Sequence, residues 1–229
     1  MNKQNEKIIY LAGNSQATDV GVETGQNYPS ILMSTLSGKA KIYTSIKSGW
    51  TLKEFADTHI SQVLTYSPDL VIMNFGIVEC AQRILSKKEK KIISYIPGSN
   101  KITAFLHKNR RTVLKLRNFL GMTTREASVS DYQKTVSRVE QIFLENSIRY
   151  LFLKIPTFSN FGNDLNHPYL ESDILQFNAI LAEYSSCSIE NEVSNWSSAY
   201  YQNGTVHFNS LGHAKIAKFL IEEIDNRIK

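Results

Sequence analysis

The 229-residue sequence has little cysteine and no grouped metal ligands. Its two cysteines, Cys80 and Cys187, are expected to be free thiols of a reducing compartment. His207 and His213 lie six positions apart, which fits no common zinc-ligand spacing. The sequence therefore predicts no metal site and no other cofactor.

Long hydrophobic runs are also missing. No stretch approaches the roughly 20 apolar residues that a transmembrane helix needs, so no transmembrane segment is expected. The first residues lack the apolar core and the small-residue cleavage site of a secretory signal. We therefore expect a cytoplasmic protein. Repeats, low-complexity tracts and an interdomain linker are absent too, which favours one domain over residues 1–229.

Acidic residues are almost missing from one part of the chain. Between Arg83 and Arg125 there are twelve Lys or Arg and one acid, Glu89, whereas the rest of the chain has 14 basic and 20 acidic residues. This asymmetry indicates an anionic ligand, partner or membrane surface, with a solvated helical face, a lid or a subunit contact as alternatives. The few aromatics of the segment are scattered, which argues against nucleic acid.

Apolar runs of strand length alternate with segments of helical spacing along the chain. Strands are expected at residues 7–12, 41–45, 70–75, 149–155 and 189–193. Helices are expected at 28–35, 52–66, 101–119, 131–146, 170–185 and 210–228. The alternation predicts an α/β fold, a single three-layer α/β/α domain with a mostly parallel sheet. Residues 84–130 are expected to form a basic helical insertion within it.

Ser15 follows the first expected strand, in the string Gly13-Asn14-Ser15. Ligands of open α/β sheets bind at the carboxyl edge, where such a turn lies. A serine there is a nucleophile if a base takes its proton, and His207 near the other end of the chain is the candidate base. The alternatives are a helix-capping serine and a histidine packed beside Phe208.

The chain resembles the SGNH (GDSL-type) hydrolase family in the order of four sites. These are Ser15, Gly49, the turn Gly76–Glu79 and His207. The resemblance covers most of the chain and implies a flavodoxin-like topology. It also implies that Ser15 is the nucleophile and that His207 is the general base. The backbone amides of Ser15 and Gly49 would form the oxyanion hole, although Gly49 alone fits a turn glycine as well.

Three positions depart from that family's motifs. Asn14 stands in place of the aspartate of Gly-Asp-Ser, and Val78 in place of the asparagine of Gly-x-Asn-Asp. Gly204 stands in place of the aspartate of Asp-x-x-His. His207 therefore needs another group to orient it, such as a backbone carbonyl, Asn203 or a distant carboxylate.

Further residues are candidates for supporting the site or for binding the substrate. Asn14, Asn74 or Arg83 are the alternatives for the missing oxyanion donor. Glu79 is a candidate supporting or binding residue, with a solvated carboxylate or an ion pair to Arg83 as the other interpretations.

The resemblance and the residues together imply serine-dependent hydrolysis or O-acyl transfer on a small or carbohydrate-like ester, through an acyl-enzyme. The enzyme would be a serine esterase or O-acetyltransferase type. The alternative is a catalytically impaired SGNH-like binding protein, whose basic segment engages an anionic ligand, a partner or a membrane surface.

Overall fold

The computed structural model describes residues 6–122, 124–157, 168–193, 196–202 and 205–228. Within these ranges, one parallel sheet has the strand order β2-β1-β3-β4-β5. Its strands are β1 (Lys7–Gly13), β2 (Ala40–Ile46), β3 (Leu70–Asn74), β4 (Arg149–Leu153) and β5 (Ser186–Cys187). This order is flavodoxin-like, so the predicted α/β fold with a parallel sheet is confirmed.

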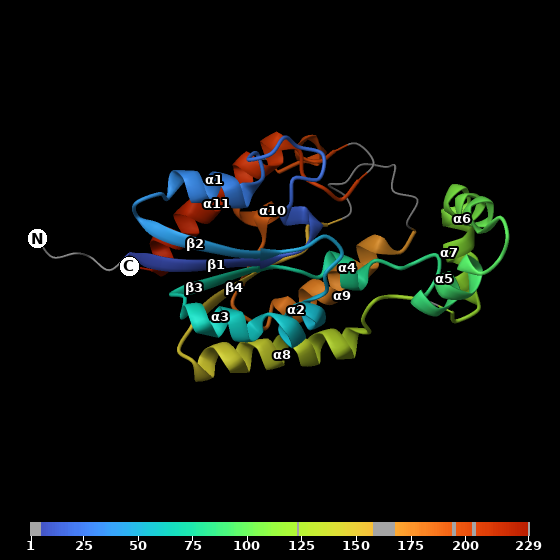
Figure 1. Ribbon diagram of the computed structural model, residues 1–229, viewed down its shortest axis with the longest axis horizontal. Coiled ribbons are helices and arrows are strands. Elements are labelled where there is room, and N and C mark those ends of the chain that lie inside the picture. Colours follow the sequence, from blue (N-terminus) through green and yellow to red (C-terminus); the bar gives the residue numbers. More distant parts are fainter. Residues whose placement is uncertain (1–5, 123, 158–167, 194–195, 203–204, 229) are drawn as a thin grey trace, which may run out of the picture.

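Helices cover both faces of the sheet (Figure 1). The central strand β3 is buried along its whole length, which explains its uninterrupted apolar sequence. One face carries α1 (Tyr28–Thr35), α10 (Ile189–Glu192) and α11 (Ser210–Arg227). The other face carries α2 (Leu52–Thr58), α3 (Ile60–Tyr66), α8 (Val129–Glu145) and α9 (Leu170–Leu181). None of the described helices is both long and apolar enough to cross a membrane.

Three helices stand apart from these layers, beyond the short helix α4 (Ile77–Cys80) (Figure 1). They are α5 (Lys87–Ser94), α6 (Ser99–Lys108) and α7 (Arg110–Phe119), and together we call them the helical lobe. Where the chain leaves the body and returns, the Arg83 amide donates to the Thr124 carbonyl at 2.6 Å. These helices lie within the basic segment and next to the carboxyl end of the sheet.

Several expected element boundaries were wrong. The segment 52–66 is two helices, α2 and α3, because His59 leaves helical geometry at φ −126°. The segment 101–119 is likewise interrupted, at Asn109. The helix expected from residue 131 is capped earlier, since the Ser128 hydroxyl accepts from the Asp131 amide at 3.0 Å.

The last expected strand, 189–193, was also wrong, because Ile189–Glu192 is the helix α10. Ile189 and Val193 are both buried, and their spacing of four residues places them on one face of a helical turn. The apolar ends of this segment also fit a short strand, so its composition alone did not distinguish the two. The edge strand β5 comes just before it, at Ser186–Cys187.

Candidate active site

The end of β1 places Ser15 at the carboxyl edge of the sheet. The Asn14 amide donates to the Asn74 carbonyl at 3.2 Å, which joins this turn to the end of β3. A Cβ on Gly13 would lie 3.2 Å from that same carbonyl oxygen, so the close approach favours glycine. The Asn14 side chain then accepts from the Gln16 amide at 3.1 Å. Ser15 opens the short 3-10 turn Ser15–Ala17 and is half-buried.

The loop before α11 brings His207 to the same edge. Gln16 Nε2 donates to the Val206 carbonyl at 3.0 Å, which links the serine turn directly to this loop. The His207 amide donates to Thr205 Oγ1 at 3.1 Å, and its carbonyl accepts from the Gln202 amide at 2.9 Å. The histidine backbone is therefore fixed on both sides.

Ser15 and His207 meet although 192 positions separate them in the sequence. His207 Nε2 lies 3.1 Å from Ser15 Oγ, within the reach of a general base. Burial lowers the pKa of His207 from its ordinary 6.5. The imidazole is therefore neutral at pH 7, and Nε2 can accept the hydroxyl proton.

The third position of a triad is not filled among the described residues. His207 Nδ1 has no hydrogen-bond acceptor in the described part of the chain. The predicted support from Asn203 falls outside the described residues, as does Gly204. The structure thus places Ser15 beside His207, without a described acceptor at Nδ1.

The two amides that were expected to form an oxyanion hole belong to Ser15 and Gly49, which line one cavity with His207. Within the described ranges, neither the Ser15 amide nor the Gly49 amide has an acceptor. Gly49 has a φ of +78°, a backbone conformation that favours glycine. Its loop is attached to the serine turn, since the Lys47 amide donates to the Gly13 carbonyl at 3.1 Å. Ser15, Gly49 and His207 line one cavity of about 380 Å³.

The three residues considered as a further oxyanion donor differ in where their side chains lie relative to the cavity. Asn74 Nδ2 points to the Tyr28 hydroxyl at 3.4 Å. Asn14 is fully buried beneath the turn, and its Nδ2 has no acceptor among the described residues. Arg83 lines the cavity itself, as does Val78, which stands where the resembled motif has asparagine. Of these alternatives, Arg83 is the one placed at the cavity.

Both expectations for the contacts of Glu79 were wrong. Its side chain is 1% exposed, so it is not a solvated carboxylate. Arg83 pairs instead with Glu126, with 3.6 Å between Nε and Oε1. Glu79 accepts from the Leu52 amide and, at 2.9 Å, from the Gly76 amide. It therefore joins the start of α2, just after the Gly49 loop, to the turn after β3.

Sequence reasoning missed Arg110, which also lines the cavity. Its place in a basic run was visible, but its position at the cavity that holds Ser15 depends on where the helical lobe places the start of α7. The remaining lining is mostly apolar, with Ile77, Val78, Ala81, Leu170 and Val206. The cavity therefore offers an apolar wall on one hand and two guanidinium groups on the other.

The sequence matches no protein-family model, and a search of curated proteins found no match. Solved structures do match over nearly the whole chain. A lipase/acylhydrolase from Enterococcus faecalis is 14% identical with a TM-score of 0.62, covering 98% of this chain and 97% of that one. TesA is 13% identical with a TM-score of 0.60, covering 96% of this chain and 99% of that one.

The psychrotrophic esterase EstA from Pseudoalteromonas sp. is similar to the same degree. It is 13% identical with a TM-score of 0.59, and the match covers 96% of this chain and 98% of that one. Likeness at such low identity is a likeness of fold. The chain thus has the fold of the SGNH (GDSL-type) hydrolases, as its motifs predicted.

Proposed function

We propose that this chain is a serine-dependent acyl-ester hydrolase or O-acyltransferase that acts on a small or carbohydrate-like ester. The observation that carries the proposal is the 3.1 Å approach of His207 Nε2 to Ser15 Oγ, beside the available amides of Ser15 and Gly49. The names of the structural neighbours, acylhydrolase and esterase, support ester chemistry. The preference for a carbohydrate-like ester rests on the sequence resemblance.

The reaction begins with attack of Ser15 Oγ on the ester carbonyl carbon, while the hydroxyl proton passes to His207 Nε2. The carbonyl oxygen becomes an oxyanion, which the amides of Ser15 and Gly49 stabilise. When the tetrahedral intermediate collapses, the carbon–oxygen bond to the alcohol breaks. The alcohol leaves with the proton from His207, and an acyl group remains on Ser15.

In the second half, water or an acceptor hydroxyl gives its proton to His207 and attacks the acyl carbon. The acid or the new ester leaves, and Ser15 recovers its proton from His207. Hydrolysis and transfer use the same residues and differ in the nucleophile that enters. The apolar wall of Val78, Leu170 and Val206 suits the acyl chain, because apolar groups of the substrate leave water when they pack against it.

The test is turnover of 4-nitrophenyl acetate and of an acetylated sugar by the wild type, Ser15→Ala and His207→Gln. Ser34→Ala is the matched control, because Ser34 is exposed on α1. We expect each site variant to lose at least about 10³-fold in kcat/KM, and the control to keep wild-type activity. A folded Ser15→Ala protein that keeps its activity would contradict the proposal. A folded wild type without turnover on esters or acceptors would point to the binding-protein alternative.

A further inference from the structure

The two arginines of the active-site cavity also line a second cavity. Arg83 follows α4, and Arg110 opens α7. Both border the cavity that holds Ser15 and His207, and both border a neighbouring cavity of about 260 Å³ in the helical lobe. The two cavities therefore share Arg83 and Arg110 as lining residues.

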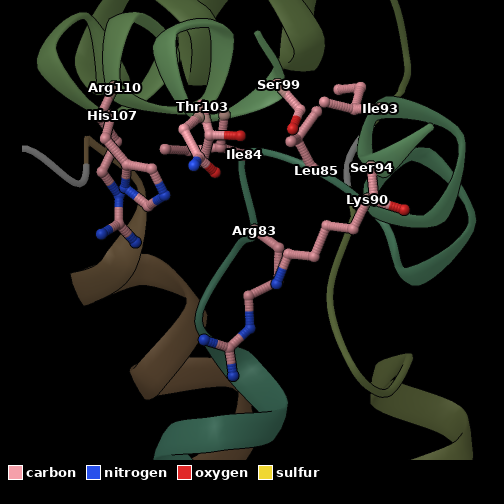
Figure 2. A pocket seen from close by; sticks show the side chains of 11 residues that line it. Arg83, Ile84, Leu85, Lys90, Ile93, Ser94, Ser99, Thr103, His107 and Arg110 are labelled. Atoms are coloured by element: carbon pink, nitrogen blue, oxygen red, sulfur yellow. The ribbon is translucent and has the colours of Figure 1, made fainter. Parts of the chain in front are cut away.

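Figure 2 shows how these side chains lie. The guanidinium groups of Arg83 and Arg110 extend in the same direction, away from the helices of the lobe and toward the body of the protein. Lys90 and His107 line the lobe cavity beside them. No acidic side chain lines either cavity among the described residues. The lining of both cavities is thus basic and contributes no carboxylate, although Glu126 pairs with Arg83 from outside that lining.

The pairing of the two arginines is incomplete. Arg83 donates Nη2 to the Val78 carbonyl at 3.2 Å and has Glu126 as an ion-pair partner. Arg110 makes no hydrogen bond or ion pair with a described residue, and its Nε is inaccessible to solvent. Burial, and then the positive charge of Arg83, lower the pKa of Arg110.

A half-buried cation beside a second cation is costly unless an anion lies between them. Arginine offers planar paired donors that match a carboxylate or a phosphate. In the described part of the protein, nothing supplies that anion to Arg110. An incoming ligand would supply it, and the place for that ligand adjoins the nucleophile.

We infer that Arg110 and Arg83 form an anion subsite, and that the substrate is an ester that carries a carboxylate or phosphate within reach of Ser15. This inference rests on the proposed function and adds the chemical class of the substrate. The anionic group lies against the two guanidinium groups, while the acyl carbon lies at Ser15 Oγ. The basic segment then serves substrate selection.

The experiment compares neutral esters with anionic esters that have the same ester linkage. The first pair is 4-nitrophenyl hexanoate and mono-4-nitrophenyl adipate, which places the anion on the acyl side, too far along the chain for rapid attack on its own ester. The second pair is phenyl acetate and 4-acetoxyphenyl phosphate, which places it on the alcohol side. The measured quantity is the ratio of kcat/KM for the anionic ester to that for the neutral ester. Since both values come from one preparation, a loss of folded protein cancels from this ratio.

We expect the wild type to prefer the anionic member of at least one pair. Arg110→Gln should lower that ratio about tenfold or more, the factor that one charge-assisted hydrogen bond provides. Arg111→Gln is the matched control, since it removes the same charge from an exposed position one residue further along α7. It should leave the ratio unchanged. An equal ratio in the wild type and Arg110→Gln, or an equal fall in Arg111→Gln, would overturn the inference.

A binding measurement separates the subsite from the chemistry. Ser15→Ala cannot form the acyl-enzyme, so calorimetry on this variant reports the affinity for each intact ester. Tighter binding of the anionic esters that is lost in Ser15→Ala/Arg110→Gln supports the subsite even if no ester is turned over. Equal affinity for neutral and anionic esters in Ser15→Ala overturns it, even if the wild type is an active esterase.

Discussion

Replacing Glu79 by glutamine tests whether one buried carboxyl holds two turns of the site together. Its two oxygens accept from the Leu52 and Gly76 amides. Glutamine keeps the size of the side chain but has one acceptor oxygen, so one of these amides would face an NH₂ group. An unpaired buried donor costs about 1–3 kcal/mol. We expect Glu79→Gln to lower the free energy of unfolding by that amount at acidic pH.

The effect should depend on pH in a defined direction. Burial raises the pKa of Glu79 from 4.5 to about 7, and the hydrogen bond from Leu52 opposes that rise. Because the folded state binds the proton more tightly, Glu79 stabilises the fold most below pH 4.5. This contribution is lost as the pH rises to about 7. A rise from 4.5 to about 7 corresponds to roughly 3 kcal/mol.

The assay is urea unfolding of the wild type and Glu79→Gln at pH 5 and pH 8. Other titrating groups, such as the buried His213, are common to both proteins and cancel in the difference. We expect the destabilisation by Glu79→Gln to be about 2–3 kcal/mol smaller at pH 8 than at pH 5. Glu171→Gln, at an exposed position on α9, is the control and should show no such change. The same destabilisation of Glu79→Gln at both pH values would refute the reasoning.

Three further predictions concern the site and its supports. Because burial lowers the pKa of His207, the acid limb of the kcat/KM profile should have its midpoint below 6.5, and a midpoint above 6.5 would contradict it. Arg125→Gln should lower the free energy of unfolding by about 3 kcal/mol in urea titrations, because Asp173, which is 1% exposed, would lose its ion-pair partner. An unchanged midpoint of urea unfolding would argue against that ion pair. Gly76→Ala should be destabilised by about 1–3 kcal/mol more than the control Gly25→Ala. The new Cβ at residue 76 would lie 2.5 Å from Ile155 Cδ1, whereas nothing lies within 4 Å of a Cβ at residue 25. Equal thermal shifts of the two variants would contradict this packing.

The sheet and the meeting of Ser15 with His207 were predictable because their signals are local or lie in short motifs. Buried parallel strands have apolar sequences, and Ser15 lies in the turn that follows one of them. The block around His207 is recognisable by its residues and by its place before the last helix. The carboxyl edge of a parallel sheet then brings the two together, without information on any particular contact.

The contacts of Glu79 and Arg110 were not predictable, because each depends on the meeting of segments far apart in the chain. Glu79 accepts from Leu52, 27 positions away, and that partner is a backbone amide without a sequence signal. Arg110 lines the cavity because of the place that the helical lobe gives to the start of α7, whereas the sequence shows it as one cation in a basic run.

The central claim is that His207 activates Ser15, and labelling with a fluorophosphonate probe tests it most directly. The folded wild type, Ser15→Ala and His207→Gln would be treated alike, with the adduct read by intact mass and the labelled residue by peptide sequencing. The account predicts rapid labelling of the wild type at Ser15, none of Ser15→Ala, and slowing of about 10³-fold or more in His207→Gln. A folded wild type that stays unlabelled, or is labelled at another residue, would contradict it.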